Sequence, residues 1–141
     1  MLQELPVEYM GEIAKLPSKG DAGTDLALTE DLIILPNLSE RAGTGLWVAI
    51  PDNTVGLIIP RSSTGKLNIM LANTVGVIDS GFRGELQLFI KNLDSEAAIM
   101  IKKGQRIAQL VIVPFITPIF KKVDKLEETE RNTKGFGSTG A

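Results

Sequence analysis

The sequence contains no cysteine and no histidine, and these two absences exclude much of enzyme chemistry. Without cysteine the chain has no disulfides, no thiolate nucleophile and no thiolate metal site. Without histidine it lacks the most common general base, the Ser-His-Asp triad and the usual zinc or iron sites. Any catalysis must therefore use carboxylates, hydroxyls, arginine or lysine, backbone amides and a hard, oxygen-bound cation such as Mg²⁺.

Aromatic residues and long apolar runs are also scarce. Aromatic residues make up 5% of the chain and hydrophobic residues 43%, so the core must consist mostly of Val, Ile, Leu and Ala. No apolar run approaches the length of a membrane span, and residues 1–10 lack the features of a secretory signal. We therefore expect no membrane association and a cytoplasmic location, or the host cytoplasm for a phage or viral gene. A net charge of -2 argues against general nucleic-acid binding through phosphates.

What the chain does contain is a series of short β-rich runs separated by turn residues, in a length that suits one domain. This pattern is typical of an all-β sandwich or barrel. In residues 84–92, Leu86, Leu88 and Ile90 alternate with other residues, which predicts one buried face. One short helix is predicted at 64–70. The predicted strands are 32–35, 45–50, 55–59, 86–90, 98–101 and 107–119.

The last predicted strand, 107–119, is nearly continuously apolar and is broken by Pro114 and Pro118. A strand that is apolar on both faces must be covered on both sides, which in a small domain favours burial against another subunit. Residues 121–130 are then highly charged and lose the apolar face. We therefore divide the chain into one β domain, 1–120, and a connector with a flexible C-terminal lid, 121–141.

Two early segments place charge among small or hydroxyl residues. Asp25 lies in 21–27, where small neighbours let backbone approach the carboxylate, although taken alone an ordinary turn leading into a strand explains this segment better. Residues 60–66 read Pro-Arg-Ser-Ser-Thr-Gly-Lys and follow an apolar strand. They predict either an anion site or a capped helix start, and they lack the spacing of a Walker loop.

Residues 73–85 predict a β-hairpin with a tight tip at Asp79-Ser80-Gly81. Asp79 and Ser80 either only build the turn, or Asp79 serves as a general base while the open backbone of the hairpin recognises a nucleobase. Phe82 is either a core ring or a stacking platform.

Two later segments also have polar groups that need partners. In residues 104–110, Gln109 is a polar residue inside a buried strand, so it requires a hydrogen-bond partner from backbone or ligand. In the tail, 132–141, Phe136 stands between glycines and is followed by two hydroxyl residues. The ring can stack, the glycines can bend and the hydroxyls can bind an anion, as in a segment that closes over a ligand.

In this order, the five segments resemble the five motifs of the homotrimeric dUTPase family, from about Ala22 to Gly140. The most specific parts are residues 76–79 and the tail, 135–140. The resemblance implies a distorted jelly-roll β-sandwich with one short helix, and a homotrimer whose three active sites are each built from all three chains. It also implies hydrolysis of dUTP to dUMP and pyrophosphate, which keeps uracil out of DNA and supplies dUMP for dTMP synthesis.

The resemblance further implies a role for each matched residue. Asp79 would activate the water that attacks the α-phosphorus, and Asp25 would hold water ligands of a Mg²⁺ ion bound mainly by the substrate phosphates. Phe82 stands where the family usually has tyrosine, which leaves open how strictly the sugar is selected. The residues implied to bind phosphates are Arg61, Ser62, Ser63, Gly65, Gln109, Arg131, Ser138 and Thr139. Those implied to contact uracil or deoxyribose are Asn73, Gly76, Val77, Ile78, Phe82 and Phe136.

Two other functions compete with this interpretation. A dCTP deaminase is similar in fold and in residues 79–84, but Phe89 stands where that family places its catalytic glutamate, and a ring cannot shuttle protons. A nucleotide-binding regulatory protein is the second alternative, because some viral and phage relatives also bind protein partners. No such partner surface is readable in the sequence, and all five motifs keep their reactive positions, which favours catalysis.

Overall fold

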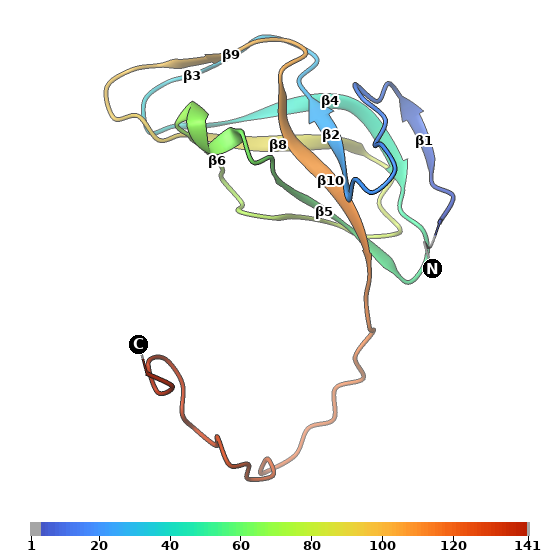
Figure 1. Ribbon diagram of the computed structural model, residues 1–141, viewed down its shortest axis with the longest axis vertical. Helices are drawn as coiled ribbons and strands as arrows, with labels where there is room; N and C mark the ends of the chain where they lie inside the picture. Colours follow the sequence, from blue (N-terminus) through green and yellow to red (C-terminus); the bar gives the residue numbers. More distant parts are fainter. Residues whose placement is uncertain (1–3, 141) are drawn as a thin grey trace.

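Short strands with alternating burial fold the chain into an antiparallel β-sandwich, seen in a computed structural model that describes residues 4–140 (Figure 1). The first sheet has the order β1-β4-β8-β6, with bounds Glu8–Gly11, Ser39–Ala49, Glu85–Asn92 and Ile69–Leu71. The second has the order β2-β10-β5-β7, with bounds Gly23–Ala27, Arg106–Pro114, Thr54–Pro60 and Gly76–Ile78. A third, two-stranded sheet pairs β3 (Leu32–Ile34) with β9 (Ile99–Ile101).

Aliphatic side chains from all three sheets form one hydrophobic core, as the composition predicts. Strand β8 confirms the predicted alternation, since Leu86, Leu88 and Ile90 are buried whereas Gln87 and Phe89 are exposed. Burial on one face of each sheet is the main contribution to the stability of such a sandwich. No helix within residues 4–140 is long and apolar enough to cross a membrane.

The predicted helix is shorter than expected. Within residues 4–140, the helical structure is one 3-10 turn, η1 (Thr64–Leu67), and Asn68 ends it with a left-handed φ of 56°. A residue in this conformation stops helical hydrogen bonding, and Ile69–Leu71 then pairs with β8 as β6. The sequence pattern did not predict β1 or β6.

The predicted hairpin at 73–85 is wrong. Strand β7 pairs with β5 in one sheet, whereas β8 pairs with β4 and β6 in the other. The tight turn itself is present, because the Phe82 amide donates to the Asp79 carbonyl at 3.1 Å. Residues 79–82 therefore form a corner between two sheets. The physical reason is that the apolar faces before and after the turn belong to opposite layers of the sandwich.

Strand β10 ends at Pro114, five residues before the predicted end at 119. Proline cannot donate to a ladder, and the last pair of this strand joins Pro114 to Thr54. Beyond it, residues 115–140 are exposed and run away from the body before bending back (Figure 1). The tail forms local turns, such as the bond from the Lys134 amide to the Arg131 carbonyl at 3.1 Å.

Candidate functional site

A groove of about 330 Å³ lies where β2, β10 and the loop after β5 meet. The register of the sheet explains why these segments converge, since Gln109 of β10 pairs with Asp25 on one side and Ile59 on the other. The side chains of Asp25, Arg61, Ser62 and Gln109 all line this groove, together with Lys15, Leu16, Pro17, Asp21, Ala22 and Gly23. The structure thus brings together the three predicted segments 21–27, 60–66 and 104–110.

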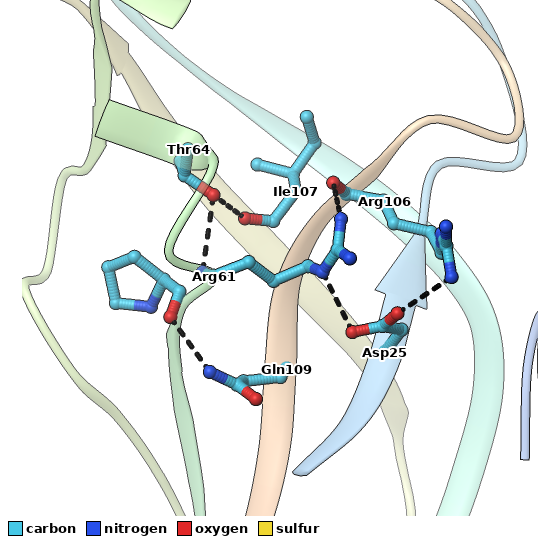
Figure 2. Close-up of polar contacts among 7 residues, drawn as sticks. Asp25, Arg61, Thr64, Arg106, Ile107 and Gln109 are labelled. Atoms are coloured by element: carbon cyan, nitrogen blue, oxygen red, sulfur yellow. Dashed lines mark hydrogen bonds and ion pairs between the residues drawn. The ribbon is translucent and has the colours of Figure 1, made fainter. Parts of the chain in front are cut away.

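Asp25 lies between two arginines at this groove (Figure 2). Its Oδ1 is 2.8 Å from Arg61 Nε, and its Oδ2 is 2.9 Å from Arg106 Nη1. Asp25 has a side chain only 17% exposed, against 26% for Arg61 and 38% for Arg106. One carboxylate between two guanidinium groups leaves an excess of positive charge, which suits an anionic ligand.

The loop that starts at Arg61 is fixed to β10 by a buried hydroxyl. Thr64 is 2% exposed; its Oγ1 donates to the Ile107 carbonyl and accepts from the Arg61 amide at 3.2 Å (Figure 2). Ser62, Ser63 and Gly65 are exposed on this loop. Within the described chain, Ser63 at the start of η1 makes no side-chain capping bond. The capped-helix interpretation of 60–66 is therefore wrong, and the hydroxyls stay available to a ligand.

Gln109 finds its predicted partner in the backbone. Its Nε2 donates to the Pro60 carbonyl at 3.1 Å, which turns the side chain across the groove (Figure 2). Gly23 permits this position, because a Cβ there would lie 2.1 Å from Gln109 Oε1. Any larger residue at Gly23 would push the amide out of its place.

The corner at 79–82 is exposed and presents a carboxylate and a ring. Asp79 is exposed, and Phe82 is 44% exposed, so the ring is not part of the core. Arg83 Nη1 holds the corner by donating to the Ser80 carbonyl at 2.7 Å and the Phe82 carbonyl at 3.0 Å. The ring lies over Gly84, where a Cβ would come within 2.5 Å of it.

Residues before the corner belong to β7, the edge strand of its sheet. Gly76 is buried, Ile78 is half-buried, and Asn73 and Val77 are exposed. Because β5 covers one side of β7, the other side presents backbone N–H and C=O groups to a ligand or partner.

The groove and the corner lie far apart within one chain. Ile78 pairs with Gly56, so Asp79 is level with Val55, at the opposite end of β5 from Arg61. At about 3.3 Å per residue, the six residues from Val55 to Arg61 span roughly 20 Å. A carboxylate at Asp79 therefore cannot act on a ligand atom held by Arg61 of the same chain.

The predicted tail residues are separate from both. Phe136 is fully exposed, as are Arg131, Ser138 and Thr139. Arg131 Nε donates to the Lys134 carbonyl at 2.9 Å, and Ser138 Oγ donates to the Gly135 carbonyl at 2.6 Å. These bonds shape two turns around the ring and leave it directed to solvent.

Sequence reasoning missed three residues that build the groove, namely Gly23, Thr64 and Arg106. Thr64 and Arg106 lie inside segments that the sequence singled out, but a pattern of residue types does not say which hydroxyl is buried or which arginine pairs with Asp25. The signal that could have identified the ion pair was Arg106 itself, because a part-buried cation needs a carboxylate partner.

A metal ion would find few direct protein ligands at this site. Within residues 4–140 no three carboxylates, histidines or cysteines form a metal-binding group. Asp25 binds a guanidinium through each oxygen. This donor set fits Mg²⁺ only in its usual form, in which phosphate oxygens and waters fill most positions and a carboxylate contacts the waters.

Comparisons with known proteins bear on all these segments. A family model described as dUTPase matches residues 10–140. The chain is 46% identical over 122 residues to the deoxyuridine 5'-triphosphate nucleotidohydrolase of Rhodococcus erythropolis, covering 86% of this chain and 74% of that protein. It is 42% identical over 141 residues to the Clostridium kluyveri protein of that name, covering 97% and 98%. The solved Staphylococcus bacteriophage 80alpha dUTPase with dUpNHpp is similar at a TM-score of 0.86 and 30% identity, covering 96% and 99%.

Proposed function

The chain belongs to the dUTPase family, and from this premise we propose that it hydrolyses dUTP to dUMP and pyrophosphate. In this reaction the oxygen of a water attacks the α-phosphorus, the bond to the bridging oxygen of the β-phosphate breaks, and pyrophosphate leaves. The observation that carries the proposal is the groove around Asp25, Arg61 and Gln109, where the Arg61 guanidinium and the exposed Ser62 hydroxyl offer donors to a triphosphate. The dCTP deaminase alternative is disfavoured because Phe89 stands where a deaminase would need its catalytic glutamate. The Phe89 ring lies on the sheet surface, with the Cζ atom of Arg41 5.4 Å from the ring centre.

The groove residues would bind and orient the phosphates. Arg61 offers charged N–H groups, Ser62, Ser63 and Gly65 offer hydroxyl and amide donors on a fixed loop, and Gln109 would contact the α-phosphate side. Holding the chain of phosphates at several points fixes the α-phosphorus for in-line attack, which supplies much of the rate in phosphoryl transfer.

Asp79 would act as the general base. It would accept a proton from the attacking water, a role for which its exposed carboxylate is suited in a chain without histidine. Mg²⁺ would offset the phosphate charge when bound, and Asp25 would contact its water ligands.

The edge of β7 would read the base. Gly76, Val77 and Ile78 present backbone groups that can pair with uracil, and Asn73 adds a side-chain amide. Recognition by hydrogen bonds rejects a wrong exocyclic group well, because a mismatch leaves buried polar groups unpaired. Phe82 would lie against deoxyribose and leave no room for a 2′-hydroxyl.

We also propose that the active protein is a homotrimer with shared sites. The roughly 20 Å between Asp79 and Arg61 within one chain supports this, since a complete site then needs the groove of one subunit and the corner of another. Exposed apolar residues on the edge strand and after β10 support burial between chains: Val77 is 63%, Ile116 91% and Phe120 90% exposed. The tail would reach the site from a third chain, with Phe136 over uracil and Arg131, Ser138 and Thr139 on the γ-phosphate.

A panel of nucleotides tests the function directly. We expect pyrophosphate release from dUTP, much slower release from UTP, dTTP and dCTP, and no ammonia from dCTP. EDTA should abolish turnover and added Mg²⁺ should restore it, because the triphosphate charge must be neutralised. Ammonia from dCTP, or equal rates with all four nucleotides, would overturn the proposal.

A further inference from the structure

Arg106 has no assigned role in the proposed reaction, yet it makes one of the two ion pairs of Asp25. We propose that Arg106 is a positioning residue. It limits the Asp25 carboxylate to one contact with Arg61, between Oδ1 and Nε, and so keeps the rest of the Arg61 guanidinium available for phosphate. This inference rests on the proposed function for its physiological ligand, a nucleoside triphosphate, but its physical basis is the geometry of three side chains.

The two arginines approach Asp25 from different places. Among the described residues Asp25 and Arg61 line the groove, whereas Arg106 approaches Asp25 from outside it. Figure 2 shows Arg61 and Arg106 on different oxygens of the same carboxylate. Arg106 thus touches the ligand-binding residue and not the ligand space.

Some N–H groups of the Arg61 guanidinium already have protein partners, and others remain for a ligand. A guanidinium has five N–H groups; here Nε forms an ion pair with Asp25 Oδ1 at 2.8 Å, and Nη1 donates to the Arg106 carbonyl at 3.2 Å. The remaining groups belong to a side chain that lines the groove, so they can meet phosphate oxygens there.

Without Arg106, the Asp25 carboxylate would pair differently with Arg61. Arginine and carboxylate prefer a two-bond, fork-like pairing when both carboxylate oxygens are free. Arg106 donates to Oδ2 at 2.9 Å and so competes with Arg61 for that oxygen, which disfavours the two-bond pairing. Once Oδ2 is released, Asp25 can rotate and take a second N–H group of Arg61, and it then competes with phosphate for the same donors.

The test is binding of inorganic tripolyphosphate and of the non-hydrolysable dUpNHpp, by calorimetry at physiological ionic strength without added metal. We expect Arg106→Met to weaken both by about tenfold, the value of a charge-assisted hydrogen bond, and Arg106→Lys to recover most of the loss. In dUTP turnover, KM should rise by a similar factor while kcat changes little. Lys102→Met is the matched control, since Lys102 also pairs with a carboxylate, Asp31, at 3.4 Å but lies outside the groove.

The Asp25→Asn background separates positioning from plain charge. If Arg106 acts through Asp25, then Arg106→Met should have almost no further effect on tripolyphosphate binding in that background. An unchanged affinity in Arg106→Met, or a loss that persists in the Asp25→Asn background, would overturn the inference. If Arg106→Met does not fold, the comparison of Arg106→Gln with Arg106→Lys takes its place. An Arg106→Lys variant that binds tripolyphosphate no better than Arg106→Gln would overturn the proposal.

The same data keep this inference apart from the proposed function. If the wild-type protein releases no pyrophosphate from dUTP, the proposed function fails, whereas tripolyphosphate binding still reports on Arg106. If dUTP is hydrolysed and the Arg106 variants bind normally, only the positioning role fails.

Discussion

Asp25 lies on β2 and Asp79 follows β7 of the same sheet, but their surroundings give these two carboxylates different chemistry. Asp25 is mostly buried and binds an arginine through each oxygen, so it is committed to positive partners. Asp79 lies exposed at a corner. A general base must have a carboxylate that is free to accept a proton from water, and of the two only Asp79 has this freedom.

At this scale we predict that Asp79→Asn abolishes turnover and leaves binding intact. Asparagine keeps the size of the side chain but cannot accept the proton, so kcat should fall by about 10²- to 10⁴-fold, while the Kd for dUpNHpp stays within about threefold. Rates of pyrophosphate release and calorimetry measure the two effects. The control is Asp31→Asn, an exposed carboxylate that binds Lys102 and the Lys103 amide. Retained turnover in Asp79→Asn would remove Asp79 as the base.

At the scale of elements, the sequence predicted strands better than their partners. The alternation in β8 is a local pattern, so it could be read directly. The pairing of β7 with β5 instead of β8 is set by which layer buries each apolar face, and no local pattern contains that information. For the same reason the role of Arg106 could not be predicted, because its salt bridge to Asp25 joins β10 to β2 across 81 residues of sequence.

The tail is the element whose role can be tested by removal. We predict that deleting residues 132–141 lowers kcat/KM at least about 100-fold, because closure of a lid orders the phosphates and excludes water. The melting temperature should stay within about 2 °C, since the tail is exposed and adds nothing to the core. Light scattering should show an unchanged assembly. A deletion that dissociates the protein would instead make the tail structural.

Phe136→Ala isolates the contribution of the ring. Stacking of a base on an aromatic side chain contributes about 1–3 kcal/mol, so we expect a loss of roughly 5- to 150-fold in kcat/KM for dUTP. Ser138 and Thr139 remain in this variant and would keep the proposed phosphate contacts. Equal losses in Phe136→Ala and the full deletion would assign the whole effect to the ring.

At the scale of the whole molecule, the groove lies at one end of the sheet and the corner at the other, so under the proposed mechanism a single chain would be incomplete. We predict that Arg61→Met and Asp79→Asn are each inactive alone but regain activity when their subunits are mixed by unfolding and refolding. In a random trimer, a site needs an intact groove from one chain and an intact corner from its neighbour, so about a quarter of wild-type activity should return. Without any recovery after mixing, each site would have to lie within one chain.

The departure of the tail at Pro114 also sets how the lid can work. Phe136 lies 22 residues beyond that point, and a flexible chain of this length has a root-mean-square span of about 26 Å. In the proposed trimer, such a tether would hold the ring near the active sites at a local concentration in the millimolar range. A lid at that concentration needs only weak contacts to close over a nucleotide, and weak contacts also open quickly. The length of the connector therefore allows tight enclosure during the reaction without slow release of product.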